Sequence, residues 1–163
     1  MRLTPVSYIV LGLLDQAGEA TPYELHQMAG SLSDLWSVPR AQLYREPERL
    51  AEAGLLTEKR EQAGRRRRRF RLTRDGRRAL RDWLDNPTAE FTELREPGLL
   101  RLFFGADPKP LARIQLEIHE RKLREYQETA KLWPGGAPAG PRRALEAGMG
   151  HEREWVRFWK RLA

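Results

Sequence analysis

Residues 55–73 read LLTEKREQAGRRRRRFRLT, and this stretch decides the fold that the sequence predicts. Near its end the apolar residues Phe70 and Leu72 alternate with arginines, which is the period-two pattern of a half-buried strand. The upstream segment 55–59 can form an antiparallel partner strand, with Gly64 at the turn between the two. The alternative is a solvated, partly disordered run of charge. The apolar alternation favours a β-hairpin tipped with arginines.

Positive charge is concentrated in the same part of the chain. Residues 59–81 contain twelve Lys or Arg residues and two acidic residues, a balance of +10 in a chain whose formal net charge is +7. The contiguous arginines at 65–69 repel one another, and a polyanion would neutralise them. This local excess favours nucleic acid as the partner, whereas total charge alone fits nucleic acid and an anionic membrane surface equally well.

Length and composition exclude several classes of protein. A chain of 163 residues with 40% hydrophobic content suits one or two small folded domains. The absence of cysteine excludes disulfides, thiolate zinc sites and cysteine nucleophiles. No apolar run is long enough to span a bilayer, and no small-residue cleavage site follows the apolar stretch 6–14. We therefore expect a cytoplasmic protein with no membrane partner.

Helix starts are marked by a capping residue followed by proline. Thr4-Pro5, Thr21-Pro22 and Asp107-Pro108 each place a side-chain oxygen before the first helical position, where proline loses nothing by lacking an N–H. In the first half, the pattern predicts helices over about 4–16, 22–30, 37–54 and 73–84. In the second half, it predicts a short apolar segment at 99–104, a long helix over 108–133 and a final helix over 142–162.

The break at Asn86-Pro87 divides the chain into expected domains 1–86 and 87–163. In the first domain, three helices followed by a two-stranded hairpin are the order of a winged helix-turn-helix, in which the third helix enters the major groove and the wing lies along the flanking backbone. The expected fold is therefore mainly α with a small β-hairpin wing, a winged helix-turn-helix followed by an all-α dimerisation domain.

The third helix has distinct faces. Leu43, Pro47 and Leu50 share the side that we expect to face the core, and charged residues occupy the opposite side. Gln42 can pair bidentately with adenine, and Arg45 with guanine O6 and N7. The alternative for this helix alone is an ordinary amphipathic helix with a charged outer face.

Other polar residues near this helix are better placed to fix the register on DNA. We expect Arg40, Tyr44 and Arg49 to contact phosphates or orient the helix, and the wing arginines to contact phosphates, with insertion into the minor groove as a further option. The residues expected to contact DNA are Tyr23, Ser37, Arg40, Gln42, Tyr44, Arg45, Arg49, Arg65, Arg66, Arg67 and Arg68.

A set of short motifs runs along the whole chain. These are Tyr23-Glu24-Leu25, Leu35-Trp36, Gln42-Leu43-Tyr44, Gly54-Leu55, Gly64-Arg65, Phe70-Arg71-Leu72-Thr73 and Gly76-Arg77, followed by Leu100 to Gly105. In this order and spacing they resemble the PadR-type transcriptional regulators, and the last resembles the start of the C-terminal helical domain in longer members. The resemblance implies a homodimeric, ligand-responsive repressor that binds an inverted repeat near promoters.

The chain departs from that family in the third helix. Many members have Tyr-Pro-x-Leu where this chain has Tyr44-Arg45-Glu46-Pro47. Pro47 removes one backbone hydrogen bond and can kink the helix near the carbonyl of Leu43. Glu46 and Glu48 place negative charge near the expected DNA surface.

The long helix of the second domain carries two apolar rows. A heptad-like row contains Leu116, His119, Leu123 and Tyr126, and a second row contains Leu111, Ile114 and Ile118. Two rows need two partners, and a second subunit is favoured because a two-fold dimer reads two half-sites. Intramolecular packing is the alternative. The expected dimer interface consists of Leu116, His119, Leu123, Tyr126, Trp133, Trp155 and Trp159.

Three further interpretations concern ligands and chemistry. Trp83, Trp133, Trp155 and Trp159 are candidates to line a pocket for a flat aromatic effector, with core packing as the alternative. We expect no enzyme, cofactor or metal site, because the histidines have no metal-binding spacing and no phosphate-cradling glycine loop precedes a helix. The competing function is a non-specific architectural or RNA-binding protein that uses the arginine wing.

Overall fold

A computed structural model describes residues 2–60, 67–133 and 138–163. The predictions that concern Gly64, Arg65 and Arg66 lie outside these residues. The chain divides into two compact units, Met1–Glu90 and Phe91–Ala163, called here unit 1 and unit 2. The expected boundary at 86/87 lies in the non-helical stretch that follows the last helix of unit 1, four residues before the division.

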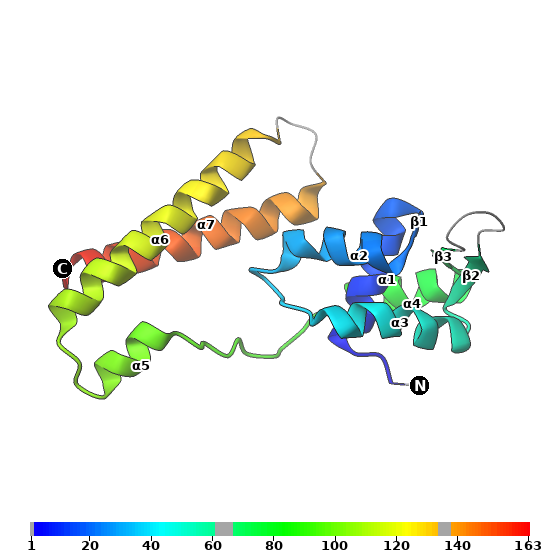
Figure 1. The fold of residues 1–163 in the computed structure, drawn as a ribbon, viewed down its shortest axis with the longest axis horizontal. Coiled ribbons are helices and arrows are strands. Elements are labelled where there is room, and N and C mark those ends of the chain that lie inside the picture. The colour runs from blue at the N-terminus through cyan, green and yellow to red at the C-terminus, as the bar shows by residue number, and fades with distance from the viewer. Residues whose placement is uncertain (1, 61–66, 134–137) are drawn as a thin grey trace. The chain divides into compact units, whose positions relative to one another are not determined.

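Unit 1 contains helices and short strands in the order of a winged helix-turn-helix (Figure 1). Its elements are α1 (Pro5–Ala17), β1 (Glu19–Ala20), α2 (Pro22–Ala29), the 3₁₀ turn η1 (Gly30–Leu32), α3 (Arg40–Glu52), β2 (Leu56–Arg60), β3 (Arg68–Leu72) and α4 (Arg74–Asp85). The mainly helical fold class with a β wing is thus confirmed.

Capping side chains begin the helices where the sequence predicted them. Thr4 and Thr21 form capping boxes before α1 and α2, and Thr73 accepts a hydrogen bond from the Gly76 amide at the start of α4. At the other ends, Gly18 and Gly54 have φ of +76° and +75°, a left-handed conformation that favours glycine because it has no Cβ. Local chemistry therefore sets most helix boundaries in unit 1.

The sheet has three antiparallel strands in the order β1-β3-β2. Strands β2 and β3 pair in the register Leu56↔Leu72 to Arg60↔Arg68, and Glu19 of β1 lies opposite Arg71. The predicted hairpin strands are confirmed, but β1 was not predicted. A strand of two residues is too short to show a period-two pattern, so it depends on its neighbour in the sheet rather than on its own sequence.

The core of unit 1 lies between the helices and one face of the sheet. It buries residues of α1, α2, α3, β3 and α4, among them Leu11, Leu25, Leu50, Phe70, Leu72 and Leu80. Phe70 and Leu72 are 0% and 3% exposed, which confirms the predicted strand alternation. Pro47 is fully buried on α3, and the helix continues through it from Arg40 to Glu52.

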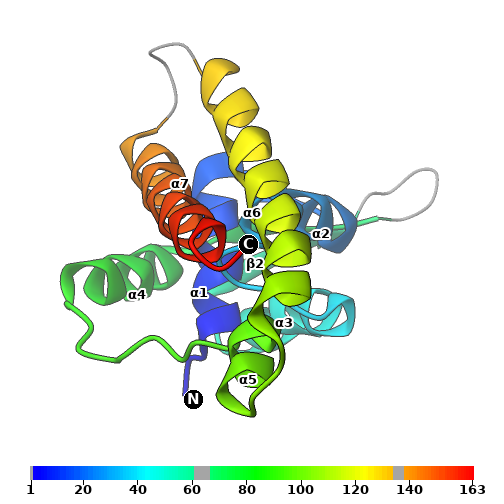
Figure 2. The ribbon, with the colours of Figure 1, turned by 90° about the vertical axis from the view of Figure 1, so that its left-hand side faces the viewer.

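Unit 2 consists of three helices, α5 (Pro97–Phe103), α6 (Pro108–Lys131) and α7 (Ala139–Lys160). Asp107 caps α6 by accepting from the Lys109 amide, as predicted. Helices α6 and α7 lie side by side and pack along their lengths (Figure 2). Trp159 of α7 is fully buried, and its indole lies next to Gly98 of α5, where a Cβ would approach it to 2.9 Å.

No helix among the described residues combines the length and hydrophobicity that crossing a membrane requires.

Candidate nucleic-acid interface

Helix α3 exposes the residues that the sequence assigned to base reading. Gln42 and Arg45 are exposed, whereas Leu43, Pro47 and Leu50 of the same helix are buried in the core. Arg45 has no ion-pair partner among the described residues. Arg40 is also exposed and donates to the Tyr44 hydroxyl over 3.4 Å, with its guanidinium 5.3 Å from the Tyr44 ring centroid. The outer face of α3 is therefore available to a ligand.

Charge is divided along α3. Its first half carries the arginines 40 and 45, and its second half carries Glu46, Glu48 and Glu52 with one arginine, Arg49. Recognition helices of the helix-turn-helix class contact base edges mainly through their N-terminal residues. The cationic half of α3 is thus the half suited to reading DNA, and the acidic half needs a separate explanation.

Glu46 belongs to a cluster that joins α3 to α1. Its carboxylate accepts a hydrogen bond from the fully buried Ser7 hydroxyl over 2.6 Å and pairs with Arg49. Arg49 also donates to the Ser7 hydroxyl over 2.9 Å. Burial acts to raise the pKa of Glu46, but the hydrogen bonds from Arg49 and Ser7 outweigh it and hold that pKa below its usual range. Glu46 is therefore a neutralised link between two helices.

This cluster changes the interpretation of Arg49. The sequence assigned Arg49 to phosphate contact or helix orientation, but its guanidinium is bonded to Glu46, to Ser7 and to the Arg2 carbonyl. Arg49, two helical turns after Gln42, thus helps to hold α3 against α1. Its contact with DNA stays a prediction.

Arg68 is likewise bonded within unit 1. Its guanidinium donates to both carboxylate oxygens of Glu58 on β2, over 2.8 and 2.7 Å, and pairs with Glu48 on α3. The Arg68 guanidinium also lies 5.4 Å from the ring centroid of Phe70. Hydrogen bonds from Arg68 lower the pKa of Glu58, aided by those from Arg60. The wing base and the acidic half of α3 are thus connected through one guanidinium.

The next arginines of β3 pair with the other side of the sheet. Arg69 contacts Glu19 of β1 over 3.2 Å and Glu24 of α2 over 3.5 Å, and Arg71 contacts Glu19 over 3.4 Å. Arg67, just before β3, is exposed and makes no ion pair with the residues described. Of the wing arginines that the structure describes and the sequence assigned to phosphate, only Arg67 is therefore unpaired.

Two further expected contacts lie on elements beside α3. Tyr23 is 55% exposed on α2, and its hydroxyl accepts from the Gln27 amide over 3.0 Å. Ser37 is exposed in the connection between η1 and α3. The preceding Leu35 and Trp36 are 70% and 50% exposed, which is unusual for large apolar side chains. The sequence suggested no role for them beyond the family resemblance.

In unit 2, the heptad-like row of α6 packs against α7. His119 Nδ1 lies 2.6 Å from a Glu152 carboxylate oxygen, and its ring stacks on Trp155 with centroids 5.6 Å apart. Tyr126 lies against Gly148 of α7, where a Cβ would be 3.1 Å from its ring. His119 and Tyr126 of the row that was assigned to a second subunit thus contact α7 within the chain, as in the alternative interpretation, whereas Leu116 and Leu123 are only partly buried. A role of this row in a homodimer stays a prediction. Trp159, also assigned to that interface, has no exposed surface left for a partner.

Further exposed apolar residues of unit 2 lie on α5 and α6. Phe103 and Phe104 at the end of α5 are 83% and 78% exposed, and Leu100 is 60% exposed. Ile114 and Ile118, from the second apolar row of α6, are 59% and 39% exposed. We call these five residues the α5–α6 apolar surface. In the sequence, Ile114 and Ile118 belong to the second apolar row, and the other three residues belong to the short apolar segment 99–104.

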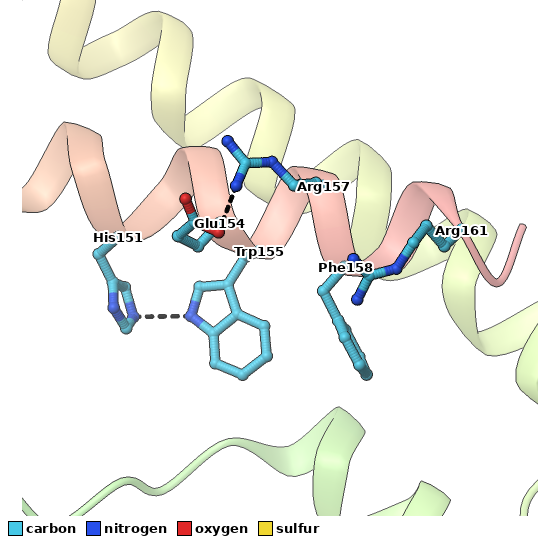
Figure 3. A pocket seen from close by; sticks show the side chains of 6 residues that line it. All are labelled: His151, Glu154, Trp155, Arg157, Phe158 and Arg161. Atoms are coloured by element: carbon cyan, nitrogen blue, oxygen red, sulfur yellow. Dashed lines mark hydrogen bonds and ion pairs between the residues drawn. The ribbon is translucent and has the colours of Figure 1, made fainter.

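Of the tryptophans proposed for an effector pocket, Trp155 and Trp159 lie together on α7, with ring centroids 6.4 Å apart. Trp83 stacks on Tyr8 within unit 1 with centroids 4.6 Å apart, and Trp159 is in the core of unit 2. Trp155 lines an open hollow of about 320 Å³ on α7, together with His151, Glu154, Arg157, Phe158 and Arg161 (Figure 3). The Trp155 indole N–H donates to His151 Nε2 over 2.7 Å, and Arg157 pairs with Glu154.

These features define the class of protein. A helix with an exposed cationic half, packed beside a sheet whose β2–β3 hairpin carries an arginine run, forms a winged helix-turn-helix domain, and a helical unit follows it. Residues 10–82 match the Transcriptional regulator PadR-like family. The matched residues all lie within unit 1, the winged helix-turn-helix part of the chain.

Solved structures share the fold over nearly the whole chain. Bacillus subtilis PadR in complex with operator DNA is 24% identical, with a TM-score of 0.86 over 98% of this chain and 97% of that one. The same regulator in complex with p-coumaric acid is 23% identical, with a TM-score of 0.81 over 96% and 95%. A PadR-like transcriptional regulator from Bacillus cereus is 20% identical, with a TM-score of 0.79 over 96% and 94%. No curated protein matches the sequence.

Proposed function

We propose that this protein is a repressor that binds an inverted-repeat operator as a homodimer in the cytoplasm. The observation that carries the proposal is the exposure of Gln42 and Arg45 on the N-terminal half of α3, where neither forms an ion pair with the residues that the structure describes. These side chains can hydrogen-bond to the major-groove edges of adenine and guanine. The neighbouring acids are occupied by Arg49 and Arg68, so they leave the reading half of the helix electropositive.

The homodimer part of the proposal depends on the α5–α6 apolar surface. Monomeric proteins seldom expose several large apolar side chains on neighbouring elements, and such surfaces often mark an interface. A second copy of the chain would cover this surface and bring two recognition helices to two half-sites. Phe103 and Phe104 would supply the aromatic anchors that protein interfaces favour.

Selection of bound fragments from genomic DNA, followed by sequencing, tests this function. We expect the full chain to enrich an inverted repeat with half-sites about one helical turn apart, or a multiple of it. Affinity for that repeat should exceed affinity for unrelated duplex by about 10³ or more. If every duplex binds with one common salt dependence, the protein is instead a non-specific architectural protein. A reporter placed behind the enriched repeat should then lose expression when the protein is present.

We further propose that a small aromatic carboxylate releases the protein from DNA by binding to the hollow on α7. Trp155 and Phe158 supply ring faces, and Arg157 and Arg161 supply guanidinium groups for a carboxylate. The related Bacillus subtilis PadR that binds p-coumaric acid supports this choice of ligand class. Titration with p-coumaric acid should quench tryptophan fluorescence in the native chain and in Trp133→Leu. Unchanged quenching in Trp155→Leu would contradict this site.

A further inference from the structure

The position of Arg68 in strand β3 determines which way its side chain points. Successive side chains of a strand alternate between faces, so Arg68 lies on the same face as Phe70 and Leu72. Those two residues are buried against the helices. Arg69 and Arg71, on the opposite face, pair with Glu19 of β1 instead. Arg68 therefore lies at the edge of the core, on the side of the helix layer.

The bonds of Arg68 engage all three nitrogens of its guanidinium group. The Nε and one terminal nitrogen bind the two oxygens of Glu58, and the other terminal nitrogen binds Glu48. Bidentate pairing of this kind is both stronger and more directional than a single-point ion pair. The three side chains are 23% to 46% exposed, so the network is partly shielded from water. A phosphate would have to compete with two bonded carboxylates for this guanidinium.

The network connects the two parts of the DNA-binding surface. Glu48 lies three positions after Arg45 on α3, and Arg68 directly follows Arg67, the exposed arginine at the base of the wing. Glu58 completes the link from the adjacent strand β2. Sequence separations of 20 and 10 residues from Arg68 to its two partners mean that the link is made only in the folded unit.

We propose that Glu48, Arg68 and Glu58 form a positioning clasp that fixes the wing relative to the recognition helix. Arg68 then acts through the placement of other residues and makes no phosphate contact, which revises its expected role. The clasp sets the distance between the base-reading residues of α3 and the arginines of the wing. This inference rests on the proposed function, because it assigns a part within the same DNA-binding surface.

Glu48→Gln distinguishes a clasp from a phosphate contact. If Arg68 bound phosphate, losing Glu48 would free one terminal nitrogen of the guanidinium for it, and affinity for all duplexes would rise alike. The clasp predicts that the ratio of operator to non-operator affinity falls by roughly fivefold to tenfold, because the two surfaces lose their common register. Using the ratio cancels the general gain from removing one negative charge. An unchanged ratio would overturn the proposal.

Arg68→Lys and Arg68→Gln provide a second readout, with Arg67→Gln as the matched neighbour. Lysine keeps the charge but cannot make the bidentate pair, so the clasp predicts a lower affinity ratio for Arg68→Lys as well. In a plot of log affinity for non-operator DNA against log salt, Arg67→Gln should reduce the slope by about one. Arg68→Gln should leave the slope unchanged, and a reduction equal to that of Arg67→Gln would refute the clasp.

The proposed sequence-specific function and the proposed clasp can be disproved by different measurements. If the unaltered chain shows no sequence preference, the proposed function is wrong, yet the salt slopes of Arg67→Gln and Arg68→Gln still decide whether Arg68 meets phosphate. Hydrogen exchange of the β2 and β3 amides gives a DNA-independent measure. It should become faster in Glu48→Gln and in Arg68→Lys while α1 stays protected, and unchanged exchange in both variants would count against the clasp.

Discussion

Unit 1 and unit 2 differ in what they leave exposed. Unit 1 buries a core drawn from all of its helices and pairs the arginines of strand β3 with its own glutamates. Its exposed apolar side chains are scattered over α2, the η1–α3 connection and the end of α4. Unit 2 exposes large apolar residues on α5 and on one side of α6. This difference suggests that unit 1 is complete within one chain and that unit 2 is completed by a partner.

Truncating the chain to unit 1 should have the largest effect, and it tests directly whether unit 1 is complete by itself. Residues 1–90 alone should stay folded and monomeric, because the core of unit 1 contains no residue beyond Leu80. Operator affinity should fall by about 10² to 10⁴, the usual loss when two linked binding sites become independent. Sedimentation velocity and operator titration would measure both. A truncated chain that still dimerised would show that unit 1 contains an interface of its own.

Introducing a single charge into the α5–α6 apolar surface tests whether unit 2 is completed by a second copy of the chain. Phe103→Glu should weaken dimerisation at least 100-fold, because an unpaired charge buried in an apolar interface costs about 3–5 kcal/mol and a symmetric dimer contains it twice. Light scattering across a dilution series gives the dissociation constant. Leu84→Glu is the control, since Leu84 is 64% exposed but lies on α4 of unit 1. If both variants raise the dissociation constant of the dimer equally, the interface is not confined to unit 2.

Changes on α3 should affect specificity without affecting assembly. Arg45→Ala or Gln42→Ala should cost about 1–3 kcal/mol of operator binding and relax preference at one base position in each half-site. Binding to a set of single-base operator variants measures the position that is relaxed. Glu52→Gln, an exposed change at the other end of the same helix, should leave base preference intact. Relaxed preference in that control would mean that the whole outer face of α3 reads bases.

Much of unit 1 could be predicted because its signals are local. Thr4, Thr21 and Thr73 cap helices by accepting hydrogen bonds from amides three residues further on, so the sequence alone reveals them. The alternation of Phe70 and Leu72 with arginines likewise predicts which face of β3 is buried. The same alternation also predicts that Arg68 lies on the face of Phe70, since it comes two residues earlier in the strand.

The remaining features depend on distant contacts. The Ser7–Glu46 bond spans 39 positions, so no local pattern could show that Arg49 would be bonded to this pair. An apolar row on α6 has the same spacing whether its partner is α7 or a second subunit, and the row of Leu116 and Tyr126 therefore left both options open. Strand β1 has two residues and exists only because β3 lies beside it.

Ser7→Ala measures how much the Ser7 hydroxyl stabilises unit 1, since this group links α1 to α3 and also accepts from the Thr4 amide in the capping box of α1. The variant removes a buried hydroxyl that donates to Glu46 and accepts from Arg49, leaving both charged groups short of one partner. We expect unit 1 to lose about 1–3 kcal/mol of unfolding free energy, measured by urea denaturation. Ser33→Ala, at an exposed position, is the control. If the two variants lose equal stability, the link between α1 and α3 contributes nothing.

Acid should weaken unit 1 through the same cluster. Glu46 has a pKa in the folded unit below its ordinary value, because hydrogen bonds from Arg49 and Ser7 outweigh the opposing effect of burial. A group of this kind binds more protons in the unfolded chain, so its stabilisation is fully present above its unfolded pKa and is lost as the pH falls through the folded pKa. Glu24 and Glu58 also have lowered pKa values and lie in unit 1.

Glu46→Gln should therefore flatten the acid limb of the stability profile of unit 1, since glutamine cannot take up the proton. Urea denaturation at a series of pH values between neutral and strongly acidic would show the difference. Glu93→Gln removes a carboxylate from an exposed pair with Arg95 in unit 2 and should leave the acid limb of unit 1 unchanged. A Glu46→Gln profile parallel to the unaltered one would mean that Glu46 binds protons equally in both states. The acid sensitivity of unit 1 would then come from Glu24 and Glu58 at the sheet, and the link between α1 and α3 would be insensitive to pH.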